Sequence, residues 1–151
     1  MDVAGITATL VVLAAHLVNK IRAFKQRIKE RPTLLNSIID SCEAVRLIAK
    51  VIEAQLKAHH VQANPQADKE EDPWHLLAIT LEGMKRLLHD FNEELGDLIK
   101  ESATTGLGRA ILQLKTDDSI PRILHIQEQI HRKYRELSVS MLSISIQFAL
   151  Q

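Results

Sequence analysis

The stretch DPWHLLAITLEGMKRLLHDFNEELGDL, residues 72–98, decides the fold class of this chain. Its large apolar residues recur at alternating steps of three and four: Trp74, Leu77, Leu81, Met84, Leu88, Phe91, Leu95 and Leu98. That spacing places one apolar stripe along an α-helix. Asp72 followed by Pro73 is a typical helix start, because Asp caps a helix and Pro suits its first turn. We therefore expect a helix from residue 73 to about residue 101.

Other segments of the chain show helical spacing of the same kind. The N-terminal segment predicts a helix over about 3–30, ended by Pro32, which disfavours helical geometry in the residue before it. A second apolar stripe predicts a helix over about 33–58. The glycine-bounded segment 108–115 predicts a short helix, and a heptad seam predicts the last helix over about 119–149.

The last helix carries two irregular features. Gln127 is the one polar residue in its apolar seam. The segment SVSMLSISIQF, residues 138–148, also alternates apolar and polar residues with period two, which suits a β-strand as well. An isolated strand would have no pairing partner in this chain, so we predict a helix here.

The composition agrees with an all-α fold. Apolar residues make up 46% of the 151 residues, and the chain has only 5 Gly and 4 Pro, fewer than the turns of a sandwich or barrel need. We predict an all-α helical bundle of four long helices plus one short helix, with residues 1–151 as a single domain. Because the sequence stops in mid-helix at Gln151, we also expect this domain to be excised from a longer protein.

The charge is balanced overall but divided along the chain. Residues 1–60 carry nine basic against five acidic residues (+4), residues 61–101 four against ten (−6), and residues 102–151 six against four (+2). A nucleic-acid-binding domain normally shows a broad basic surface, and this division argues against one. The single cysteine, Cys42, excludes an intrachain disulfide and fits a cytoplasmic location. No basic region precedes the apolar start, so no secretory signal is predicted.

No motif in the chain indicates an enzyme. The seven histidines form neither an HExxH motif nor a Cys/His pairing, so we expect no metal site and no cofactor. Gly106-Leu107-Gly108 lacks the strand and the GK[ST] ending of a phosphate loop and is expected to be a turn between helices. Cys42 lies on an apolar stripe and is expected to be a core thiol. We predict no small-molecule substrate.

The N-terminal run Val3–Val18 is unusual because Thr7, Thr9 and His16 are its only polar residues. Sixteen helical residues span about 24 Å, less than the roughly 30 Å hydrocarbon core of a bilayer. The run is therefore either a fully enclosed core helix or a segment that is stored in the bundle and can leave it for a membrane. The membrane-insertion candidates are Val3, Ile6, Leu10, Val11, Leu13 and Leu17.

A basic cluster follows this run and would suit anionic lipid headgroups. The headgroup candidates are Lys20, Arg22, Lys25, Arg27, Lys29 and Arg31. The seam of the last helix is the predicted surface for self-association, since long apolar helices can pack between bundles as well as within one. Its candidate residues are Ile130, Tyr134, Leu137, Met141, Ile144 and Phe148.

Several segments together resemble the fungal HeLo-like N-terminal domains. They are MDVAGITATLVVLAAHLV (1–18) with the basic stretch after it, WHLL (74–77), GLGRAILQLKTDDSIPRILHIQEQI (106–130) and SISIQFAL (143–150). The resemblance covers most of the chain and rests on apolar spacing, not on catalytic residues. The long basic cluster before Pro32 is more charged than expected for that family.

The resemblance implies a helical bundle akin to the HeLo domain and to the bundle of the mixed-lineage kinase-like necroptosis executioner. Such domains precede NLR-type (STAND) receptors and ankyrin-repeat proteins. It also implies a non-enzymatic role in programmed cell death, heterokaryon incompatibility or innate immunity, in which an activated cytoplasmic domain oligomerises and moves to the plasma membrane. The alternative is a purely structural interaction or oligomerisation module without membrane activity.

Overall fold

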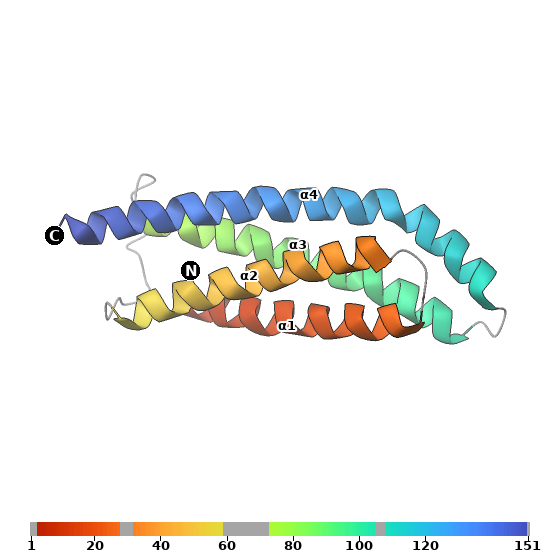
Figure 1. The fold of residues 1–151 in the computed structure, drawn as a ribbon. Coiled ribbons are helices and arrows are strands. Elements are labelled where there is room, and N and C mark those ends of the chain that lie inside the picture. The colour runs from red at the N-terminus through yellow and green to blue at the C-terminus, as the bar shows by residue number, and fades with distance from the viewer. Residues whose placement is uncertain (1–2, 28–31, 59–72, 105–107, 151) are drawn as a thin grey trace.

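The computed structural model describes residues 3–27, 32–58, 73–104 and 108–150, and these residues form four α-helices. They are α1 (Val3–Arg27), α2 (Pro32–Ala58), α3 (Pro73–Thr104) and α4 (Gly108–Ala149). Consecutive helices run in opposite directions (Figure 1). The predicted all-α bundle is confirmed, and the segment with period-two alternation in α4 is helical.

The arrangement of the helices is that of two hairpins laid side by side. The α1–α2 and α3–α4 contacts are the most extensive, α1 also packs along α3, and α2 meets α4 over a shorter stretch. In the described parts of the chain, no Cα atom of α1 lies within 8 Å of one in α4, and the same holds for α2 and α3. The order around the bundle is therefore α1, α2, α4, α3, and the neighbours α1 and α3 run parallel (Figure 1).

The prediction of a separate short helix is wrong, because residues 108–149 form one helix of 42 residues. Pro121 lies inside it. A proline there removes one backbone hydrogen bond and its ring clashes with a carbonyl one turn back, which kinks a helix without necessarily ending it. Figure 1 shows a bend in the N-terminal part of α4, the region that contains Pro121.

The core is a single cluster to which all four helices contribute. Among the described side chains, α1 supplies nine buried hydrophobic residues, α2 eight, α3 seven and α4 four. Trp74, at the start of α3, packs half-buried against this cluster. The apolar α1 is therefore the largest contributor to the core, and α4 is the most peripheral helix over the residues described.

A network of polar side chains joins α2 to α4. The Gln127 amide nitrogen donates to Ser37 Oγ at 2.8 Å and to Ser41 Oγ at 3.1 Å. Ser41 Oγ also lies 2.8 Å from His131 Nε2 and donates to the Ser37 carbonyl at 3.0 Å. The Ser41 hydroxyl has one proton for these two contacts, so when it donates to the Ser37 carbonyl it accepts from His131. The polar exception in the predicted seam thus fixes the register of the two helices.

The contact between α3 and α4 is close at Gly83. A Cβ at this position would lie 3.2 Å from the Lys133 Cε, so the glycine leaves room for the aliphatic part of that lysine. Arg122 of α4 and Glu94 of α3 form an ion pair at 3.3 Å further along the same pair of helices. The α3–α4 hairpin is therefore held by packing and by a charged pair.

We predict that Gln127→Ala lowers the free energy of unfolding by about 2 kcal/mol, because it removes two hydrogen bonds that join α4 to α2. Gln147→Ala, at an exposed position of the same helix, should change it by less than about 0.5 kcal/mol. Urea denaturation measures both values. In a Ser41→Ala background the Gln127 substitution should cost less, because the two side chains share a bond; equal costs in both backgrounds would contradict the network.

Candidate functional site

The predicted membrane-insertion residues of α1 are mostly core residues in this conformation. Val3, Ile6, Leu10, Leu13 and Leu17 are buried, and Val11 is half-buried against the core. They lie along the side of α1 that packs on α2 and α3. None of these side chains can meet a membrane unless α1 moves away from its neighbours.

The opposite face of α1 is open, so α1 is not fully enclosed by the other described helices. Ala4, Gly5, Ala8, Thr9 and Val12 are exposed, and Val12 has 69% of its surface accessible. No charged residue occurs between Val3 and Asn19. A helix on the surface of a soluble bundle normally shows charged and polar residues to water. The outward face of α1 shows small and apolar ones.

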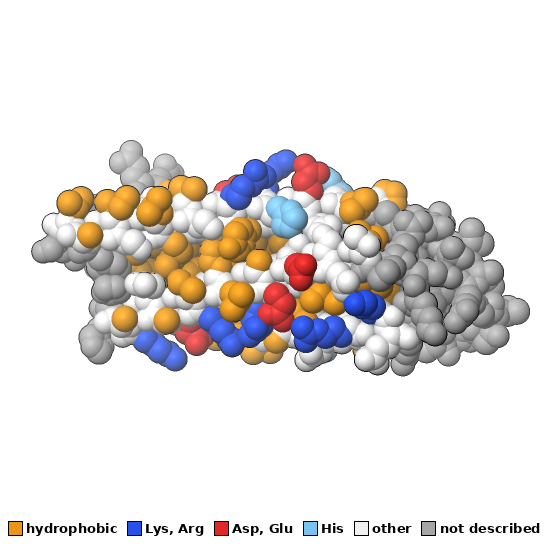
Figure 2. Space-filling model, in the orientation of Figure 1, with side chains coloured by type: hydrophobic (Ala, Val, Ile, Leu, Met, Phe, Trp, Pro, Cys, Tyr) orange, Lys and Arg blue, Asp and Glu red, His pale blue; other side chains and the backbone are white. Residues whose placement is uncertain are grey.

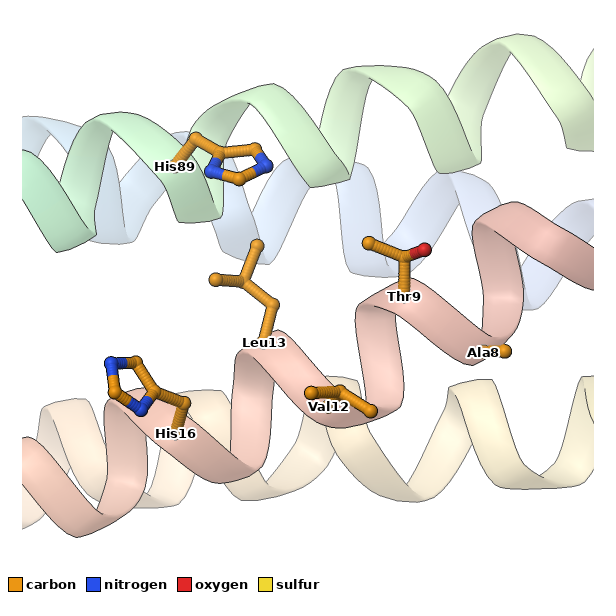
Figure 3. Close-up of a pocket in the computed structure, with 6 residues that line it drawn as sticks. All are labelled: Ala8, Thr9, Val12, Leu13, His16 and His89. Atoms are coloured by element: carbon orange, nitrogen blue, oxygen red, sulfur yellow. The ribbon is translucent and has the colours of Figure 1, made fainter.

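A shallow groove of about 460 Å³ runs along this face, between α1 and α3. It is lined by Ala8, Thr9, Val12, Leu13 and His16 of α1 and by His89 of α3. Figure 3 shows the two imidazoles on separate helices, with Leu13 between them. The walls are mainly apolar and the histidines supply the polar rim. The sequence did not predict that His89 joins α1, because spacing within one helix does not reveal which helix lies beside it.

Residues Val3–Gln26 form a helix that is long and apolar enough to cross a bilayer, judged by length and composition alone. In the bundle, 39% of its most apolar window is buried. The core helix of a soluble protein satisfies the same criteria. The observed helix is longer than the sixteen apolar residues that the sequence analysis measured against a bilayer, because α1 continues through the first basic residues.

The basic cluster divides into anchored and free parts. Lys20 Nζ donates to Asn92 Oδ1 of α3 at 2.7 Å, and Lys25 Nζ donates to Asn36 Oδ1 of α2 at 2.6 Å. Arg22 is exposed. The side chain of Arg27 and the residues Lys29 and Arg31 lie outside the described residues. Two of the predicted headgroup ligands therefore hold α1 to its neighbours in this conformation.

The predicted self-association seam of α4 faces the interior of the bundle. Ile130, Leu137 and Ile144 are buried, and Tyr134 and Met141 are half-buried against the core. The Phe148 side chain lies outside the described ones. Contact between two copies through this seam would require α4 to leave its own bundle.

The described residues contain no group of three or more His, Cys, Asp or Glu side chains that could hold a metal ion. A second hollow, of about 380 Å³, lies beside the polar network between α2 and α4, and Asp40 and Tyr134 help to line it. Cys42 is buried, as predicted, and burial together with the neighbouring Glu43 charge raises the pKa of its thiol to about 12.

No protein-family model, curated protein or solved structure matches this chain. The resemblance to fungal HeLo-like domains therefore stays a prediction.

We predict that alkaline pH destabilises the fold through Cys42. The unfolded thiol loses its proton near pH 9.0 and the folded one near pH 12, so the stability that the neutral thiol contributes is complete below pH 9 and is lost as the pH rises through this window. The urea midpoint of the wild type should fall more steeply between pH 9 and pH 11 than that of Cys42→Ala. Equal slopes in the two proteins would show that the thiol does not contribute.

Proposed function

We propose that this domain is a non-enzymatic effector that self-associates and binds membranes through α1. The observation that carries the proposal is the uncharged outward face of α1 over its first four turns. Such a face makes few favourable interactions with water, whereas it can enter the apolar interior of a bilayer without desolvating a charge. An exposed arginine, Arg22, follows the run on the same helix and suits anionic headgroups.

Release of α1 is a conformational change that a membrane must favour. Nine buried hydrophobic residues hold the helix in the bundle, and each large one contributes about 1.5–3 kcal/mol when it is removed from water. The same surface gains a comparable amount on entering lipid, so the bilayer replaces the interactions that α1 gives up. A ligand shifts such an equilibrium only by its difference in affinity for the two states. The soluble state should therefore predominate without lipid.

The resemblance to HeLo-like domains supplies the biological setting of the proposal. It implies a cytoplasmic domain of a fungal NLR-like protein that is recruited to the plasma membrane and takes part in regulated cell death or innate immunity. Both the resemblance and the membrane proposal depend on the apolar N-terminal run and on the basic residues after it.

A structural interaction module is the second candidate, and the burial of α1 favours it. Over the described residues, α1 supplies more buried hydrophobic residues than any other helix, as the core helix of a soluble bundle would. In that case α1 never leaves, and the domain acts only by packing against a partner.

The two candidates differ in how they respond to charge on the outward face of α1. Ala8→Glu and Val12→Glu alter exposed positions, so each should leave the thermal unfolding of the bundle nearly unchanged. Both should abolish leakage of anionic liposomes, because a carboxylate at the bilayer centre costs roughly 3 kcal/mol. Dye release from liposomes measures the loss, and circular dichroism checks the fold.

Ala54→Glu is the matched control, since it introduces the same charge at an exposed position of α2. Its leakage should equal that of the wild type at the same lipid composition. A wild-type domain that neither binds nor permeabilises anionic liposomes would contradict the membrane proposal and leave the interaction module. Substitution at Leu10 or Leu13 is unsuitable, because both side chains are buried and a charge there would unfold the bundle.

We also predict that loosening the anchors of α1 promotes leakage. Asn36→Ala and Asn92→Ala remove the acceptors of Lys25 and Lys20 and leave the lysines free for headgroups. The two hydrogen bonds, one part-buried and one exposed, together contribute about 1–2 kcal/mol, so the initial leakage rate should rise about 5- to 30-fold in the double variant. Asn19→Ala, exposed on α1, should not change the rate. A slower rate in the double variant would show that these contacts are not restraints.

A further inference from the structure

Exposed hydrophobic side chains gather on one side of the bundle, away from α1. Ten large hydrophobic residues are exposed among those described, and six of them lie on α2, on the C-terminal half of α4 or directly after α4. We name this set the α2–α4 face: Leu47, Val51, Val139, Leu142, Ile146 and Leu150. Figure 2 shows hydrophobic side chains along that half of α4 and between it and α2.

The register of the two helices brings these residues to one level. Ser37 meets Gln127 and Ser41 meets His131, so each contact joins residues 90 apart in the sequence. Both helices rise about 1.5 Å per residue in the same direction, and this offset continues along them. Val51 is thereby level with Met141 and the neighbouring Leu142. The exposed residues of α2 and of the C-terminal half of α4 thus lie at similar levels along the bundle.

The face is uncharged where it is most apolar. The last fifteen residues, 137–151, contain no Asp, Glu, Lys or Arg, and serine supplies most of their polar groups. Val139 and Leu142 are 64% and 61% exposed. Charged side chains border the hydrophobic area in Figure 2 and do not interrupt it. Two copies of such a face can pack together without placing like charges against each other. A twofold interface requires this, because it brings the same patch of both copies into contact.

The size of the face suits a small dimer. A fully exposed Val, Leu or Ile side chain presents on the order of 60–120 Å² of apolar surface, so these six, at exposures of 52–84%, present roughly 200–450 Å². A standard interface buries about 800 Å² per partner, of which about 60% is apolar. The face therefore supplies most of the apolar area of an interface at the lower end of that range.

We propose that the α2–α4 face is a twofold interface with a second copy of this chain, centred on the C-terminal half of α4. This deepens the self-association part of the proposed function and rests on it, but it involves no movement of α1 and no membrane. It also replaces the inward-facing seam of α4 with a surface that is accessible while the bundle is closed. The occupant is the same face of another copy, related by a twofold axis.

Sedimentation velocity of the 151-residue chain over a wide concentration range tests the proposal without lipid. The wild type should change from monomer to dimer as its concentration rises. Ile146→Glu and Val51→Glu place a charge on the face at positions that are each 52% exposed, and each should weaken the dimer at least tenfold. Ile79→Glu is the matched control, because Ile79 is 46% exposed on α3. Its dimer should equal that of the wild type.

The outcomes separate this inference from the membrane proposal. A wild type that remains monomeric at every concentration overturns the inference, and the face then serves another partner or another segment. A dimer that Ile79→Glu weakens as much as Ile146→Glu also overturns it, because the interface then lies elsewhere. Liposome leakage is read in the same variants. Leakage with a monomer leaves the membrane proposal intact, and a dimer without leakage leaves the interface intact.

Discussion

The burial of the apolar side of α1 is the interaction on which the rest of the structure depends. A helix without a charge from Val3 to Asn19 cannot remain in water alone, and α2 and α3 cover it from two sides. This explains the unusual order around the bundle, in which α1 lies beside the parallel α3 and diagonal to α4.

The composition that makes α1 a good core helix also makes it compatible with lipid. Leu10 and Leu17 are fully buried, and the same side chains would be as stable in hydrocarbon. What distinguishes α1 from α3 is the outward face. Helix α3 shows Arg86, Asp90 and Glu93 to water, which fixes it at a protein surface. Helix α1 has no such residues over its first four turns, so its place in the bundle depends on packing and on the anchored Lys20 and Lys25.

Apolar spacing predicted the helices well, because burial of one stripe is a property of each helix by itself. The positions of Cys42 and of the polar Gln127 in the core followed from the same spacing. The continuity through Pro121 did not, since a proline can end a helix or only bend it, and the outcome depends on what the helix packs against. The Lys20–Asn92 hydrogen bond and the groove that His16 and His89 both line were not predicted either. Both require the parallel alignment of α1 and α3, which no local sequence pattern contains.

The two candidate surfaces are compatible because the bundle separates them. Helices α1 and α4 are diagonal, so the outward face of α1 and the C-terminal half of α4 point away from each other. A dimer formed through the α2–α4 face would leave α1 of each copy at the outside, where its groove with α3 stays open. The polar network of Gln127 and Ser41 has a specific role in this arrangement. It fixes the register of α2 against α4, and that register sets the exposed residues of both helices at similar levels along the bundle. Self-association would then depend on a buried hydrogen bond, and membrane contact on a helix at the opposite corner of the same bundle.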